Sequence, residues 1–319
     1  MRIAIPMTVL VTALACSLVS VPAHARARVF VASYGNDSNP CTFGSPCKTF
    51  QQAVNVVDAG GEVTAIDSAG FGPITINKAI TITSPNGVEA GIVPAPGGDA
   101  IDINAGPNDA VQLEGLHIDG SGVGSNGIVF NSGRGLTVTN CVVQNFHFSS
   151  FPSGNGIFIA PASGTASFAI TNTTASNNGG VGIFFSQTGS ATLNGILDHV
   201  VANNNSGGIA IQPSVGPWDF AISNSIVSNN SDNGIVVANL GTDPLTVSID
   251  NTTANSNLVG ISGQRAATVL LNRSVIQGND TGIQNATTNN SFFTYGNNAI
   301  DFNTGINKST PLNTLTQLR

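Results

Sequence analysis

The chain has 319 residues, only 8% of them charged, and a formal net charge of −7. Lysine and arginine are too few to form the basic face of a nucleic-acid-binding protein, and the acidic balance argues mildly against a polyanionic substrate. Thirty-seven glycines, with abundant Asn, Thr and Ser, are untypical of a helical protein of this length, which would contain far more Glu, Lys and Leu.

The first 25 residues have the pattern of a signal peptide. Arg2 supplies a positive start, residues 3–21 are almost wholly apolar, and residues 23–25 (Ala-His-Ala) match a cleavage site. A single membrane anchor is the alternative, but the apolar stretch is short for one, and no later segment is long and apolar enough to span a bilayer. We therefore expect residues 1–25 to be removed and the protein to be periplasmic or secreted.

Residues 26–60 are predicted to form an N-terminal strand, loop and helix. Cys41 and Cys47 lie six residues apart in a turn-rich loop, which in an exported chain is typical of a local disulfide. The alternative, a metal site, lacks further ligands nearby. Apolar residues at helical spacing follow over 48–60, where Gly60 is a stop signal. We expect this helix to cap one end of the domain.

The pair Gly-Ile recurs at a nearly fixed period through the rest of the chain. Its seven copies begin at Gly127, Gly156, Gly182, Gly208, Gly234, Gly260 and Gly282, at intervals of 29, 26, 26, 26, 26 and 22 residues. Such self-similarity is the signature of a repeat architecture. Two further runs with alternating apolar and polar residues precede each copy, so each repeat contains three short strands. An Asn or a substitute between the first two strands marks a tight bend, where its amide can stack on the Asn of the next coil.

Three strands per repeat without intervening helices predict an all-β parallel β-helix over residues 61–290, with like positions stacked about 4.8 Å apart. The alternation places residues such as Phe130 inside, together with Cys141 as a small buried hydrophobe. Because both ends of a solenoid expose core, we expect residues 291–319 to form a C-terminal cap, with Phe302 among the covering side chains.

The repeat, written Asn-x-Val/Ile-x-x-Asn-x-x-Gly-Ile, resembles the parallel β-helix repeats of the pectin-lyase-like superfamily over roughly residues 60–305. The opening, residues 29–37 and 47–50, resembles a group of bacterial exported right-handed β-helix repeat proteins, a group without an assigned activity. The resemblance implies a right-handed coil, as parallel crossovers generally have. It also raises the expectation of a polysaccharide lyase or glycosidase, although a fold does not fix function.

The motifs of known β-helix enzymes are absent from the sequence. A pectate-type lyase needs cations beside the uronate carboxylate, yet the only Lys and Arg of the coils are the scattered Lys78, Arg134, Arg265 and Arg273. No polygalacturonase-type motif, nucleophile elbow, zinc spacing or repeated calcium motif occurs. We expect neither a cofactor nor a bound metal.

One polar cluster interrupts the regular coils. His117 and Asp119 lie two apart in a predicted strand, so both point outward on the same face, and the next coil places Gln144 beside Asp119. Insertions on one face of a solenoid often build its binding site. An inserted loop follows Gln144 and supplies further candidates, namely Phe146, His147, Phe148 and Phe151. The alternative is that exposed His-x-Asp pairs are common and that the loop phenylalanines only cover a sheet.

Aromatic residues provide two more binding candidates. Phe158 and Phe184 occupy the outward column of neighbouring Gly-Ile strands, where two exposed rings in register form a platform for sugar faces. Packing beneath the inserted loop is the alternative. Trp218, in a Pro-rich turn, is a weaker candidate.

Two functions agree with these features. The first is a non-catalytic exported scaffold that binds polysaccharide or a cell-surface partner, because polar Asn, Thr and Ser faces suit hydroxyl recognition. The second is a polysaccharide lyase or glycosidase at His117, Asp119 and His147, with His117 or Asp119 as general base and Arg134 as charge stabiliser. The lack of a clear acid/base constellation favours the scaffold. An adhesin or assembly element, which would form oligomers, is a third alternative.

Overall fold

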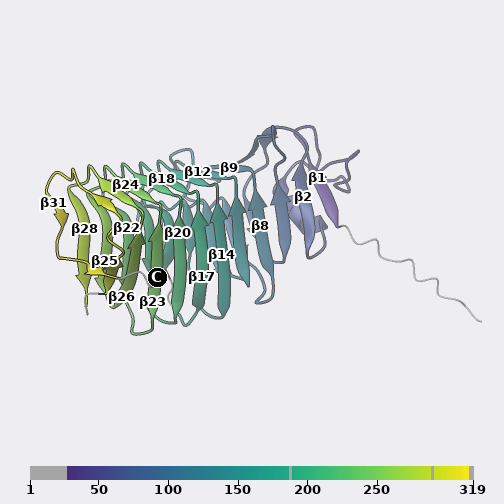
Figure 1. Ribbon diagram of the computed structural model, residues 1–319. Coiled ribbons are helices and arrows are strands. Elements are labelled where there is room, and N and C mark those ends of the chain that lie inside the picture. Colours follow the sequence, from purple (N-terminus) through teal and green to yellow (C-terminus); the bar gives the residue numbers. More distant parts are fainter. Residues whose placement is uncertain (1–26, 187–188, 289–290, 316–319) are drawn as a thin grey trace, which may run out of the picture.

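The computed structural model describes residues 27–186, 189–288 and 291–315, so the predicted signal peptide lies outside the described residues. The described chain is a parallel β-solenoid in which three long sheets run side by side, with one short helix near the N-terminal end (Figure 1). The predicted all-β fold is thereby confirmed. No described helix has the length and apolar character needed to cross a membrane.

Each regular coil contributes one strand to each of three sheets, which we name A, B and C in chain order. Sheet A contains β1 (Arg28–Val31), β2 (Gly61–Ala65), β5 (Ile80–Thr83), β8 (Ala110–Glu114), β11 (Gly135–Thr139), β14 (Thr165–Thr171), β17 (Thr192–Asp198), β20 (Trp218–Ser223), β23 (Leu245–Asp250), β26 (Ala267–Asn272), β29 (Phe292–Thr294) and β32 (Asn313–Thr314). Sheet B contains β3 (Ala69–Gly70), β6 (Ala90–Ile92), β9 (Leu116–Asp119), β12 (Val142–Gln144), β15 (Thr174–Ser176), β18 (Val201–Asn203), β21 (Ile226–Ser228), β24 (Thr253–Asn255), β27 (Val275–Gln277) and β30 (Ala299–Ile300). Sheet C contains β4 (Ile74–Ile76), β7 (Ile101–Asn104), β10 (Ile128–Ser132), β13 (Ile157–Ile159), β16 (Val181–Ser186), β19 (Gly207–Gln212), β22 (Asn233–Asn239), β25 (Val259–Arg265), β28 (Thr281–Thr287) and β31 (Ile306–Lys308).

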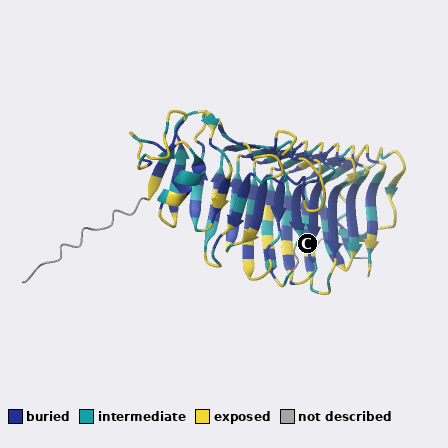
Figure 2. Cartoon of the chain, turned by 180° about the vertical axis from the view of Figure 1, so that it is seen from behind, coloured by how far each residue is buried: buried dark blue, intermediate teal, exposed yellow. Residues whose placement is uncertain are grey.

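The core runs the length of the solenoid between the three sheets, as the buried stretches in Figure 2 show. Phe130, Phe168, Phe185 and Phe220 form a continuous stack inside it, with ring centroids 5.1, 5.6 and 4.6 Å apart. Cys141 is buried, as predicted, and this burial raises the pKa of its thiol to about 11. The thiol therefore acts as a small packing group rather than as a nucleophile.

The tight bend between sheets A and B is confirmed by its backbone. The bend residues have left-handed φ angles of 45–55°: Asn140, Asn172, His199, Asn224, Asn251 and Arg273. Side-chain stacking at this bend is only partial. Asn251 Nδ2 donates to Asn224 Oδ1 at 2.7 Å, and Asn224 Nδ2 donates to Asp198 Oδ1 at 2.7 Å.

A buried asparagine ladder that we did not predict lies six residues after the bend, at the corner between sheets B and C. Its members are Asn178, Asn205, Asn230, Asn257 and Asn279. Each Nδ2 donates to the Oδ1 of an asparagine in the following coil at 2.9–3.2 Å, and the acceptor for the last member is Asn303. Each also donates to a main-chain carbonyl of the preceding coil. The ladder thus satisfies buried polar groups that would otherwise destabilise the corner.

The N-terminal helix is α1 (Phe50–Val56), shorter than the predicted 48–60 because Val57 already has extended backbone. Its N-cap is Thr49, whose hydroxyl accepts a hydrogen bond from Gln52 N at 3.2 Å. The predicted disulfide between Cys41 and Cys47 is present.

The side chain of Gln51 on α1 pairs with the outer edge of β4, the terminal strand of sheet C. Thr75 N donates to Gln51 Oε1 at 2.7 Å, and Gln51 Nε2 lies 3.4 Å from Thr75 O. The helix therefore protects a strand edge that would otherwise be open to pairing with another chain.

At the other end, short strands extend all three sheets. Phe292 is buried, but Phe302 is 82% exposed. The expectation that Phe302 covers the last coil is therefore wrong, because its ring lies in solvent.

Candidate functional site

His117 and Asp119 lie on β9 and Gln144 on β12, where Gln144 is the register partner of Asp119, as predicted. Gln144 Nε2 donates to Asp119 Oδ2 at 3.0 Å and lies 3.1 Å from His117 Nε2. The other ring nitrogen of His117, Nδ1, lies 2.8 Å from Glu89 Oε1. The cluster is thus a continuous chain of hydrogen bonds across three coils.

Asp119 is saturated with hydrogen bonds from the protein. Ser121 N donates to its Oδ1 at 2.6 Å, and Asn145 Nδ2 donates to its Oδ2 at 2.9 Å, beside the bond from Gln144. Burial by itself raises the pKa of Asp119, but these hydrogen bonds outweigh burial and hold the pKa below its usual value. A carboxylate stabilised in this way is a weak general base, so the geometry describes a brace between coils.

The structure does not bring Arg134 to this cluster. Arg134 precedes β11 at the corner between sheets C and A, whereas His117 and Asp119 lie on sheet B, and the length of a sheet A strand separates the two corners. Its predicted role as charge stabiliser for that cluster is therefore wrong. In the described parts of the chain, no group of three or more His, Cys, Asp or Glu side chains is placed to hold a metal ion.

Phe146 is a core residue and not a ligand-contacting one, contrary to its prediction as a binding residue. Its side chain is buried, and three glycines make room for the ring. A Cβ at Gly120 would lie 2.7 Å from a ring carbon, and one at Gly127 would lie 3.0 Å from another. The repeat therefore widens here to admit an aromatic side chain.

The rest of the inserted loop is exposed but braced. Phe148 and Phe151 are 49% and 69% exposed, and His147 is exposed with its main-chain N donating to Gly124 O at 2.8 Å. The Ser153 hydroxyl accepts hydrogen bonds from the amides of Ser149 and Ser150 at 2.9 and 3.1 Å. These bonds fix the shape of the loop that carries the two rings.

The predicted aromatic platform at Phe158 and Phe184 is wrong. Both side chains point outward from sheet C but are buried, in a strip that includes Val129 and Ala210. The Phe151 ring of the inserted loop packs on Phe184 at 6.2 Å, so the alternative of packing beneath this loop holds.

Trp218 is also unavailable to a ligand. Its ring is buried against Phe220, and Nε1 donates to Ala191 O at 3.2 Å. Trp218 sits at an inward position of β20 rather than in the exposed turn that the sequence suggested.

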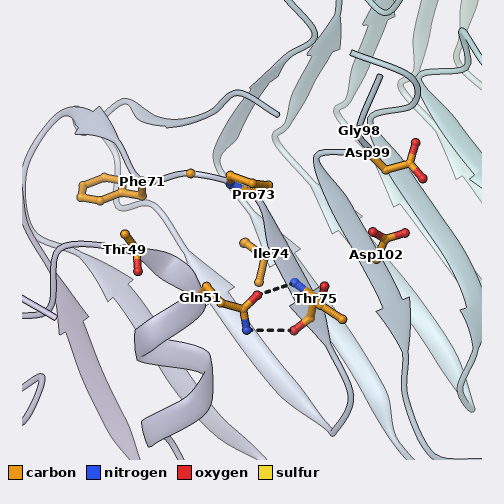
Figure 3. Close-up of a pocket in the computed structure, with 10 residues that line it drawn as sticks. Thr49, Gln51, Phe71, Pro73, Ile74, Thr75, Gly98, Asp99 and Asp102 are labelled. Carbon is orange, nitrogen blue, oxygen red and sulfur yellow. Dashed lines mark hydrogen bonds between the residues drawn. The ribbon is translucent and has the colours of Figure 1, made fainter. Parts of the chain in front are cut away.

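A groove of about 540 Å³ lies between α1 and the first strands of sheet C, at a place that no motif in the sequence indicates (Figure 3). Its walls include Gln51, Phe71 and Pro73, and it contains the carboxylates of Asp99 and Asp102. Asp102 lies on β7, and Asp99 lies just before this strand.

The two carboxylates of the groove have different surroundings. Asp99 Oδ1 accepts hydrogen bonds from the backbone N and from Nδ2 of Asn126, both at 2.9 Å. No described residue donates a hydrogen bond to the carboxylate of Asp102. Burial, and then the negative charge of Asp99, raise the pKa of Asp102 above its ordinary value. An acid with a raised pKa beside a second carboxylate is the arrangement used in general acid catalysis.

Two comparisons with known proteins agree with this fold. A family model described as "Right handed beta helix region" matches residues 99–247. The crystal structure of the pectate lyase Pel9A is similar with a TM-score of 0.55 and 15% sequence identity, over 89% of this chain and 78% of that one. No curated protein matches the chain. The chain is thus a right-handed β-helix solenoid with the pectin-lyase-like fold.

Proposed function

We propose that the protein is an exported, non-catalytic scaffold that binds polysaccharide through the loop of residues 145–153. The observation that carries this proposal is the pair of exposed rings on the loop, Phe148 and Phe151. Exposed aromatic faces suit stacking with the apolar faces of sugar rings. Ser153 braces the loop backbone, and Phe151 rests on Phe184, so little conformational freedom is lost on binding.

Export is part of this proposal, with the polymer on a cell surface or in the surrounding matrix. The disulfide between Cys41 and Cys47 supports it, because such bonds persist in oxidising compartments. The signal-peptide pattern of residues 1–25 supports it as well. The saturation of Asp119 by hydrogen bonds favours the scaffold over catalysis at the predicted cluster.

A glycan array followed by titration calorimetry tests the proposal. The double variant Phe148→Ala/Phe151→Ala should reduce affinity for the bound glycan by about tenfold or more, because alanine removes the stacking faces. Phe43→Ala is the matched control, since Phe43 is 65% exposed in the N-terminal loop. Unchanged affinity in the double variant, or an equal loss in the control, would refute the assignment to this loop.

The groove favours a second candidate function, hydrolysis of a glycosidic bond. In this reaction, protonated Asp102 donates its proton to the glycosidic oxygen as that bond breaks, and Asp99 takes a proton from the water that attacks the anomeric carbon. The raised pKa of Asp102 is the specific observation in its favour.

Assays for new reducing ends distinguish the two functions on the same glycans. Hydrolysis predicts products that disappear in Asp102→Asn, while binding through Phe148 and Phe151 remains intact. The absence of products from every glycan that binds would remove the hydrolase and leave the scaffold.

A further inference from the structure

A long stretch of the solenoid carries acidic charge without any lysine or arginine. Between Arg134 and Arg265 there are five acidic residues and no basic residue other than two histidines. The acidic residues are Asp198, Asp219, Asp232, Asp243 and Asp250. Among the described residues, Arg273 of the next coil pairs with Asp250 alone, so a ligand that lies along these coils meets a net negative field, which favours cations.

Within this stretch, β14, β17, β20 and β23 lie side by side in sheet A and present one outward face (Figure 1). Their register aligns three outward columns along the solenoid. The first column is Ser167, Asn194, Asp219 and Thr246, the middle is Ala169, Ile196, Ala221 and Ser248, and the third is Thr171, Asp198, Ser223 and Asp250. Polar columns thus flank a mainly apolar one.

This face is hollowed where the first two columns meet. Two adjoining hollows, of about 440 and 270 Å³, are both lined by Asn194 and Asp219. Pro217 and Pro244 line the smaller hollow, and Ala221 lines the larger. Ile196, which is 54% exposed, offers an apolar surface beside the polar groups.

Two polar side chains in the hollows are open to a ligand. No described residue forms a hydrogen bond with the side chain of Asn194 or Asp219, and both residues are exposed. The two carboxylates of the third column are engaged instead. Asp198 accepts from Ser223 and Asn224, and Asp250 pairs with Arg273. Asp219 is therefore the open carboxylate of this face among the described residues.

We propose that this face binds an amino-sugar polymer with free amines, with an ammonium group at Asp219, hydroxyls at Asn194, and a sugar face on Ile196. Stacked coils repeat like positions about every 4.8 Å, which suits an extended repeating chain. The strands of this face are paired on both sides, so their backbones offer a peptide no strand edge to extend. Recognition must come from side chains, and the hydroxyl, amide and carboxylate groups suit an amino sugar.

Titration calorimetry of the full chain with a glucosamine hexamer tests this proposal, with the N-acetylated hexamer and a galacturonate hexamer as comparisons. Only the hexamer with free amines should bind this face, and its affinity should fall as salt is added. Asp219→Asn should weaken this binding by about fivefold or more, since the change removes an open charge at an exposed position. Asp232→Asn, in an exposed turn of the same acidic stretch, should leave it unchanged.

Four outcomes would overturn the proposal. The first is that the glucosamine hexamer does not bind. The second is that Asp219→Asn and Asp232→Asn weaken its binding equally, which would indicate diffuse charge, and the third is that oligolysine binds as tightly and with the same dependence on Asp219. The fourth is that binding of the hexamer is lost only in the double variant of Phe148 and Phe151. The last result would assign the amino sugar to the inserted loop, so the two sites are tested separately.

Discussion

The regular and irregular halves of the solenoid solve the same packing problem at the corner between sheets B and C in different ways. From Asn178 onward, an unbroken asparagine ladder fills the corner, and each amide donates to the following coil. In the preceding coil the position six residues after the bend is Phe146, which is buried. There the amides of Asn155 and Asn126 donate backward instead, at 3.1 and 2.9 Å, and the series ends on Asp99.

The change in the direction of these hydrogen bonds links the structure of the corner to two candidate sites, the groove and the loop of residues 145–153. The ladder of the regular half joins one amide to the next, so none of its amides donates to a carboxylate. The short series of the irregular half ends on the carboxylate of Asp99, which lies in the groove beside Asp102. Phe146 likewise anchors the loop that exposes Phe148 and Phe151. Departures from the repeat thus create the chemically distinctive groups of this region.

The largest expected effect comes from removing the Phe146 ring, which occupies the position of the ladder asparagine. Phe146→Ala should lower the free energy of unfolding by about 3–5 kcal/mol, because it leaves a cavity lined by Gly120 and Gly127. Denaturant unfolding followed by circular dichroism measures this loss.

Phe146→Asn tests whether the corner of this coil is equivalent to the corner of the regular coils. Asn178 Oδ1 already accepts from Phe146 N at 3.2 Å, so an asparagine amide at 146 is placed to donate to it as in the regular ladder. We expect Phe146→Asn to lose less stability than Phe146→Ala. A larger loss would show that this corner is not equivalent to the regular one.

A smaller loss is expected from breaking the ladder itself. Asn230→Ala should cost about 2–3 kcal/mol, because it removes hydrogen bonds to Asn205 and Asn257 and leaves buried groups unsatisfied. Asn255→Ala is the control, since no described residue forms a hydrogen bond with that side chain, and it should change stability by no more than about 0.5 kcal/mol. Equal losses in thermal unfolding would contradict a special role for the ladder.

Local periodicity predicted the coils well because each strand exposes one face to the core. It correctly placed Phe130 and Cys141 inside and paired Asp119 with Gln144. Alternation gives only the direction of a side chain, however, and not what covers it. The exposure of Phe158 was therefore mispredicted, since the inserted loop folds back over that part of sheet C.

Other features depend on contacts that the repeat does not encode. The groove forms because α1 docks against sheet C, and that packing has no periodic signal in the sequence. Ala100-Ile101 takes the place of Gly-Ile one coil before Gly127, and aligning it with the later copies would have placed Asp102 on the outward face. The column of asparagines six residues after the bend is likewise visible in the sequence, but the alternation of apolar and polar residues predicts no buried ladder there.

The smallest expected effect is a pH-dependent change in Tm that distinguishes Asp102 in the groove from Asp119, whose hydrogen bonds brace neighbouring coils. Burial and Asp99 raise the pKa of Asp102, so the protonated form stabilises the fold at low pH. This contribution is lost as pH rises through the pKa of Asp102 in the folded protein. Asp102→Asn should therefore raise the Tm by about 1–2 °C at pH 7 and change it little at pH 3.

Asp119→Asn gives the opposite sign, which makes it a suitable control in the same calorimetric scans. The pKa of Asp119 is lowered, so its ionised form stabilises the fold above the ordinary pKa of an aspartate, and this contribution is lost as pH falls through the lowered value. The substitution should lower the Tm at pH 7 and have less effect in acid. A lower Tm for Asp102→Asn at pH 7 would mean that its carboxylate braces the fold like Asp119, and it would remove Asp102 as the acid of the groove.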